Sequence, residues 1–227
     1  MAEIKPQIGI LGLGSRSTLF YIAQLNQKYK ALKGGYNTCP FILLNTNFND
    51  INPFLPNHQT LKKNLLPYLK AVKKLNISRL LIPNITLHET TDQLAENLKP
   101  EVSIIHPIIS TIKSLKDNGK TNVILFGSLH SMKAAYISQY FLENNINVSL
   151  PKEDEMRFID DLRQKVYSNK ESQKEINLFN ELTKSYTSHK TVVIACTELS
   201  IALDLKIDNV YDMVQLQLNE ALRQLRE

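Results

Sequence analysis

One cysteine of this sequence stands where acid–base chemistry is feasible. Cys196 follows the apolar run at residues 192–195 and is followed by Thr197 and Glu198. This pattern predicts a strand that ends at the N-terminus of a helix, where the helix dipole lowers the pKa of a thiol. A buried, inert cysteine is the alternative. Because a hydroxyl and a carboxylate follow at once, we predict that Cys196 is a reactive thiol and that Cys39 reacts more slowly.

Two pairs of segments indicate an internal repeat. Residues 80–89 (LLIPNITLHE) resemble residues 192–201 (VVIACTELSI), and residues 8–17 (IGILGLGSRS) resemble residues 122–131 (NVILFGSLHS). In both pairs the two segments are separated by about 112 to 114 residues. Since the spacing is shared by two separate places, it predicts two similar halves.

Short apolar runs rich in β-branched residues alternate with segments of helical period, which is typical of parallel sheets covered by helices. We therefore predict an α/β fold of two pseudo-symmetric lobes, each a parallel sheet flanked by helices. The lobes span residues 1–112 and 113–211, and a C-terminal helix at 212–227 packs back on the first. The expected strands are 8–11, 41–44, 80–82, 102–105, 123–126, 148–150 and 192–195, and the expected helices are 18–32, 58–75, 131–144, 153–168 and 170–188.

Parallel sheets bind ligands beyond the carboxyl ends of their strands. The repeated segments place polar residues at that end, so an active-site cleft between the lobes is expected. The residues predicted to line it are Ser15, Arg16, Ser17, Asn84, Thr86, Ser128, Cys196, Thr197 and Glu198.

Composition argues against several other functions. The net charge of +5 comes from scattered lysines without interleaved aromatic residues, which disfavours nucleic-acid binding. The spacing of the two cysteines and the five histidines fits no metal site. The glycine-rich turn at 12–15 lacks the third glycine of a dinucleotide loop, and the N-terminal apolar run is too short to span a membrane. A cytoplasmic protein without cofactor, metal or membrane partner is expected.

Together, these motifs resemble the aspartate/glutamate racemase family. The resemblance rests on Cys-Thr-Glu at 196–198, the Pro-x-x-Thr-x-His turn at 83–88, the loop at 8–18, the FGSLHSM run at 126–132, and the segments at 43–51, 151–155 and 210–213. It implies cofactor-independent proton transfer at the carbon next to a carboxylate, with one thiol from each half on opposite faces of the substrate. A homodimer that acts on a small carboxylate or amino acid is also implied.

Carried onto this chain, the second-half thiol is Cys196, and Asn84 occupies the position of the first. An amide cannot serve as acid or base at neutral pH. The resemblance therefore leaves a hydroxyl or water for the other face, with Thr86 or Thr18 as the relay. The predicted substrate-binding residues are Ser15, Arg16, Ser17, Thr18, Asn45, Ile85, Ser128, Thr197 and Glu198.

The cations that grip substrate carboxylates in the family are missing at the expected positions. Phe158 stands about where a lysine is expected, Arg157 is one residue out of register, and Arg16 is a possible replacement. Three interpretations follow. The first is a racemase of this family that uses Cys196. The second is a one-thiol decarboxylase of a malonate-like acid. The third is a carboxylate-binding homologue without catalysis.

Overall fold

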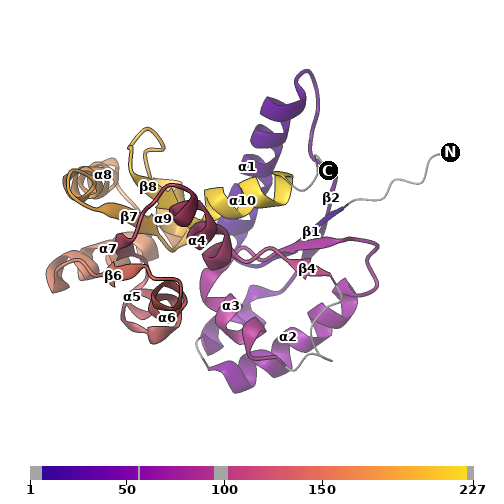
Figure 1. Cartoon of the computed structure of the whole chain (residues 1–227). Coiled ribbons are helices and arrows are strands. Elements are labelled where there is room, and N and C mark those ends of the chain that lie inside the picture. The colour runs from indigo at the N-terminus through magenta and orange to yellow at the C-terminus, as the bar shows by residue number, and fades with distance from the viewer. Residues whose placement is uncertain (1–6, 56, 95–101, 224–227) are drawn as a thin grey trace. The chain divides into compact units, whose positions relative to one another are not determined.

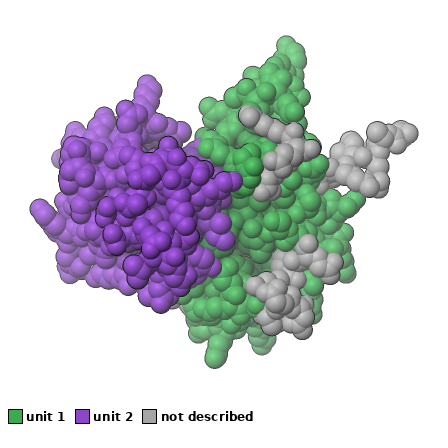
Figure 2. Space-filling view, in the orientation of Figure 1, with its two compact units in different colours: residues 1–106, 217–227 green, residues 107–216 purple. Residues whose placement is uncertain are grey.

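The computed structural model describes residues 7–55, 57–94 and 102–223. The chain divides into two compact units, of which unit 1 holds residues 1–106 and 217–227 and unit 2 holds residues 107–216 (Figure 2). Each unit contains one sheet of four parallel strands with helices beside it, which confirms the predicted fold class. None of the described helices combines the length and the apolar character needed to cross a membrane.

The sheet of unit 1 has the strand order β2-β1-β3-β4. All five residues of β1 are buried, as expected for a central parallel strand that is covered on both faces. The elements of unit 1 (Figure 1) are β1 (Ile8–Gly12), α1 (Ser15–Lys33), β2 (Phe41–Asn45), the short 3₁₀ helices Phe48–Asp50 and Asn52–Phe54, α2 (His58–Val72), β3 (Arg79–Leu81), α3 (Ile85–Asp92) and β4 (Ser103–Ile104).

The apolar face of α2 forms much of the unit 1 core. Leu61, Leu65 and Leu69 recur every four residues and are fully buried against the sheet. The C-terminal segment contributes a buried polar link: Tyr21 Oη on α1 donates a hydrogen bond of 2.6 Å to Gln217 Oε1, and Gln217 Nε2 donates one of 2.6 Å to Ile105 O. The end of the chain is therefore part of unit 1.

Unit 2 repeats the strand order of unit 1, as β6-β5-β7-β8. Its central strand β7 is buried along its whole length, and β5 is buried except at Asn122. The elements are α4 (Pro107–Asp117), β5 (Asn122–Phe126), α5 (Leu129–Lys133), α6 (Ala135–Glu143), β6 (Asn147–Ser149), α7 (Glu153–Tyr167), α8 (Gln173–Thr187), β7 (Thr191–Ile194), α9 (Thr197–Ala202), β8 (Val210–Asp212) and α10 (Met213–Arg223), the last of which enters unit 1 at Gln217.

Two local predictions were wrong. The helix expected at residues 131–144 is two helices, α5 and α6, because Ala134 between them is extended, with φ −73° and ψ 146°. The short strand β8 was not predicted, and it is followed by α10, which lies within the C-terminal helix expected at residues 212–227. The acidic run at residues 153–155 does form the first turn of α7, where its charges suit the helix dipole.

Candidate active site

Cys196 occupies the turn between β7 and α9. It is the N-cap residue of α9, with extended backbone angles of φ −159° and ψ 131°. Its carbonyl oxygen accepts a hydrogen bond of 3.1 Å from the backbone N–H of Ser200 and lies 3.1 Å from the Ser200 hydroxyl oxygen. The same hydroxyl donates to Asp212 Oδ1 at 2.7 Å at the end of β8, which fixes α9 against the sheet. The backbone position of the cysteine is therefore rigidly defined.

The thiol of Cys196 is buried and hydrogen-bonded. Its Sγ donates to Glu198 Oε2 at 3.0 Å, and the side chain of Glu198 is partly exposed. Burial, together with the negative charge of Glu198, raises the pKa of Cys196 well above its ordinary value, although Arg163 acts in the opposite direction. The prediction of a lowered thiol pKa was therefore wrong, because desolvation and a neighbouring carboxylate outweigh a six-residue helix.

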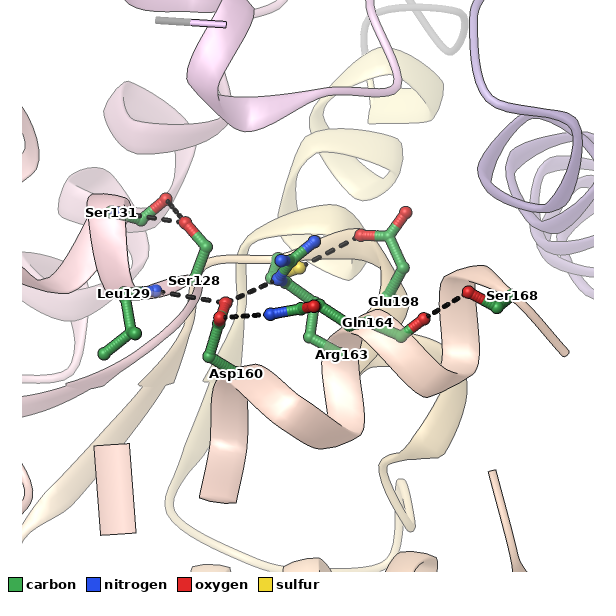
Figure 3. Close-up of polar contacts among 9 residues, drawn as sticks. Ser128, Leu129, Ser131, Asp160, Arg163, Gln164, Ser168 and Glu198 are labelled. Atoms are coloured by element: carbon green, nitrogen blue, oxygen red, sulfur yellow. Dashed lines mark hydrogen bonds and ion pairs between the residues drawn. The ribbon is translucent and has the colours of Figure 1, made fainter. Parts of the chain in front are cut away.

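Arg163, a cation on α7, acts electrostatically on this thiol, and Figure 3 shows it with Asp160 and Glu198. Arg163 Nε donates to Asp160 Oδ1 at 2.7 Å, and the guanidinium interacts electrostatically with both Cys196 and Glu198. Asp160 is itself held by Leu129 N at 3.2 Å and by Gln164 Nε2 at 2.7 Å. Although burial alone would raise the pKa of Asp160, these partners keep it below its ordinary value, so the pair is ionised.

The turn after β5 adds hydroxyl and backbone groups to unit 2. Ser128 caps α5: its Oγ accepts from Ser131 N at 3.0 Å and lies 2.9 Å from Ser131 Oγ. A side chain at Gly127 would lie only 3.2 Å from the Cβ of Ser131, so the turn needs a residue without one. Thr197 Oγ1 is buried and makes no hydrogen bond with the described residues. Whether Thr197 contacts a ligand stays a prediction.

Asn84 stands at the corresponding turn of unit 1, between β3 and α3. Its Oδ1 accepts from Leu87 N at 2.9 Å, and its backbone angles are φ −159° and ψ 114°. The side chain is thus used as the N-cap of α3. Ile85 is buried beneath this turn, and Thr86 is partly exposed.

The turn after β1 is stabilised by hydrogen bonds that its own hydroxyl groups form. Thr18 Oγ1 accepts from Leu13 N at 2.9 Å, and Ser17 Oγ donates to Gly14 O at 2.9 Å. Both residues are buried, whereas Ser15 is exposed and Arg16 is partly exposed. Asn45 is exposed at the carboxyl end of β2. The structure places these predicted binding residues at the carboxyl ends of neighbouring strands of unit 1, and whether they bind a ligand stays a prediction.

His88 on α3 packs against His106, and the two form a histidine pair. His88 is fully buried, its Nδ1 has no hydrogen-bond partner among the residues that the structure covers, and its ring lies 4.7 Å from that of His106. Burial, and then the charge of His106, lower the pKa of His88 to about 3. His106 Nε2 lies 3.3 Å from Asp92 Oδ2. His88 is therefore neutral at physiological pH, and its surroundings are those of a core residue.

Cys39, the other cysteine of the chain, is buried. Burial raises the pKa of Cys39 to about 11, and its backbone N–H is bound by Asn26 Oδ1 at 2.9 Å. In the described part of the chain, no group of three or more histidine, cysteine, aspartate or glutamate side chains is arranged to hold a metal ion.

Comparison with known proteins identifies the family. The family model for Asp/Glu/hydantoin racemases matches residues 10–221. The chain belongs to this racemase family. No curated protein sequence matches it.

Solved structures of racemases share the fold. An aspartate racemase homologue from Pyrococcus horikoshii is 19% identical, covers 98% of this chain and 100% of its own, and has a TM-score of 0.79. The aspartate racemase of Picrophilus torridus is 18% identical, covers 96% and 94%, and has a TM-score of 0.78. A glutamate racemase from Francisella tularensis in complex with D-glutamate is 14% identical, covers 97% and 81%, and has a TM-score of 0.57. At these identities the likeness shows the fold.

Within this racemase fold, sequence reasoning missed the Asp160–Arg163 pair. The cation was expected near Phe158 and Arg157. Arg157 is exposed and pairs with Glu153 on its own helix at 3.5 Å. The signal in the sequence was an aspartate and an arginine three residues apart, which share one face of a helix. Such pairs are common on helix surfaces, so only the packing of α7 against α9 distinguishes this one.

Proposed function

We propose that this member of the racemase family is an isomerase that transfers a proton at the α-carbon of a small amino acid or carboxylate, without a cofactor, and that Cys196 is its acid–base thiol. The observation that carries the proposal is the Cys196–Glu198 hydrogen bond at the end of β7, with the Arg163 guanidinium beside it. An inert core cysteine packs as a small apolar residue and needs neither a carboxylate nor a cation near its sulfur.

The protonation state of the resting Cys196 thiol decides whether it donates or accepts a proton. Because the pKa of Cys196 is raised, the resting side chain is a thiol and acts as a proton donor. The partner on the opposite face first removes the α-proton, which breaks the C–H bond and leaves its electron pair on the α-carbon. The S–H bond of Cys196 then breaks, a new C–H bond forms at that carbon, and the sulfur keeps the S–H electron pair. In the reverse step the thiolate removes the same proton. The partner for the opposite face is a hydroxyl or water, for which Thr86 and Thr18 stay the predicted candidates.

A second function is favoured by the state of Asn84. Its amide oxygen already caps α3, and an amide is neither acid nor base, so unit 1 supplies no thiol at the repeat position. A reaction that needs one proton donor suits such a protein. Decarboxylation of a malonate-like acid breaks a C–C bond and leaves a carbanion, which the Cys196 thiol protonates from one face.

Proton exchange in deuterated water distinguishes these functions. The enzyme is incubated with L- and D-aspartate, L- and D-glutamate and substituted malonates, and products are followed by NMR and chiral chromatography. Deuterium at the α-carbon with inversion supports the isomerase. Loss of carbon dioxide with deuterium incorporated on one face supports the decarboxylase instead. Binding without exchange or decarboxylation would overturn both and indicate a carboxylate-binding protein.

A further inference from the structure

Arg163 is held in a fixed orientation by three successive contacts. Its Nε is bound to Asp160 Oδ1 at 2.7 Å, and the carboxylate of Asp160 is fixed by Leu129 N and Gln164 Nε2. The side chain of Asp160 is 8% exposed and that of Arg163 is 25% exposed. A partly buried guanidinium bound on one edge keeps its other edge in one place, because its nitrogens form a rigid plane.

The two terminal nitrogens of Arg163 make no hydrogen bond with the residues that the structure describes. The positive charge of Arg163 lowers the pKa of Cys196, whereas the charge of Glu198 raises it. Cys196 and Glu198 both raise the pKa of Arg163. The charged groups that act on this thiol are therefore Glu198 from α9 and Arg163 from α7, with Asp160 behind the arginine.

We propose that Arg163, oriented by Asp160, is a positioning residue that stabilises the negative charge on the Cys196 sulfur when its proton leaves. This inference rests on the proposed function and adds the group that makes a buried thiolate attainable. Proton donation leaves the S–H electron pair on sulfur in a site that already holds the carboxylate of Glu198. Without a nearby cation, two adjacent negative charges in a buried site are strongly unfavourable.

A purely structural role for the Asp160–Arg163 pair makes a different prediction. If the pair only joined α7 to the turn at Leu129, removing the arginine charge would lower the stability of unit 2 and leave the ionisation of Cys196 unchanged. The ionisation of the thiol is therefore the informative readout. It is independent of substrate and turnover, so its result does not depend on whether the proposed reaction is correct.

The experiment measures the ionisation of Cys196 directly. In a Cys39→Ser background the isotopically labelled cysteine gives one Cβ NMR signal, which is followed against pH. We expect Arg163→Gln to move the ionisation of Cys196 to higher pH, by roughly tenfold or more in the ionisation constant, and Glu198→Gln to move it to lower pH. Arg157→Gln, on the same helix but exposed and paired with Glu153, should leave it unchanged.

Three further proteins keep the test decisive. The Arg163→Gln effect is also measured in the Glu198→Gln protein, where the thiol ionises at lower pH, and Arg163→Lys retains the charge if the glutamine variant is too unstable. An Asp160→Asn/Arg163→Gln protein separates the lost cation from the uncovered Asp160 charge. A high ionisation pH in that protein supports the proposal. Ionisation as in the parent protein, or no effect of Arg163→Gln, would overturn it whether or not α-proton exchange is observed.

Discussion

The turns that follow β3 and β7 have the same backbone geometry and use their side chains differently. Asn84 and Cys196 are both N-cap residues, with φ −159° in each and ψ of 114° and 131°. The Asn84 amide accepts a hydrogen bond from the third residue of its helix. The Cys196 thiol forms no capping hydrogen bond of comparable geometry and donates to Glu198, although the backbone N–H of Leu199, at the equivalent position of α9, also acts on its sulfur. The Asn84 side chain therefore stabilises its helix, whereas the Cys196 side chain retains a proton that it can donate.

This difference shows that the same turn can hold either a capping amide or a thiol. Asparagine is among the best N-cap residues, whereas cysteine is a poor hydrogen-bond acceptor. A thiol at such a position is a cost to the helix, and asparagine removes that cost. The repeated backbone is compatible with either side chain, so the chemistry of the two turns can be exchanged experimentally.

The largest expected effect comes from restoring a thiol to unit 1. The family resemblance implies a first-half thiol at position 84, so Asn84→Cys should raise racemisation of aspartate, glutamate or a close analogue. General acid–base catalysis contributes roughly 100- to 10,000-fold, which is the range expected over the wild-type rate. Chiral chromatography of the product measures the gain.

A second substitution controls for stray thiol reactivity. Asn84→Cys combined with Cys196→Ala should lose the gained activity, because the gain requires a thiol on each face of the substrate. If Asn84→Cys binds a dicarboxylate but shows no α-proton exchange, the turn at position 84 does not take the part of the family's first thiol.

The next effect is the acid sensitivity of unit 1. Because the folded pKa of His88 is about 3 and its ordinary value is 6.5, the unfolded chain binds this proton first as pH falls. The stability present above pH 6.5 is lost between pH 6.5 and 3, at about 1.4 kcal/mol per pH unit. Urea unfolding at several pH values, with hydrogen exchange to locate the change in unit 1, measures this slope. In His88→Leu the slope should decrease, and an unchanged slope would show that another group is responsible.

The smallest effect is the difference in capping between the two turns. Asn84→Ala should lower the free energy of unfolding by about 1 kcal/mol, whereas Asn84→Asp keeps the acceptor and should change it little. At position 196, serine adds a capping hydroxyl, so Cys196→Ser should be neutral or slightly stabilising. Urea denaturation compares the variants. A stability loss in Cys196→Ser as large as that in Asn84→Ala would mean that the thiol, too, is structural.

Most of the sheet could be predicted from the sequence because buried parallel strands are almost wholly apolar. The runs at residues 8–11, 123–126 and 192–195 correspond to β1, β5 and β7. Strand β8 is only three residues long and ends at Asp212, so its composition gives no strand signal. The six-residue helix α9 is also too short to show a helical period, and only the preceding strand located it.

The positions of Cys196 and Glu198 after a buried strand could be predicted from the sequence, and their electrostatics could not. Cys196 and Glu198 could be selected from their order in the chain, but the sign of the thiol pKa shift depends on burial, which sequence spacing does not reveal. Arg163 was missed because its relation to Cys196 depends on how α7 packs against α9. Asn84 was identified as a departure from the family pattern, although its capping role required the coordinates of Leu87.

In the proposed function, proton transfer at the α-carbon depends on the thiol of Cys196. The most direct test is deuterium incorporation at the α-carbon by the wild-type protein, by Cys196→Ser and by Cys39→Ser, followed by NMR with the substrate that exchanges fastest. The wild type and Cys39→Ser should exchange at the same rate, and Cys196→Ser should be slower by roughly 100-fold or more. Exchange by Cys196→Ser at the wild-type rate would contradict the claim.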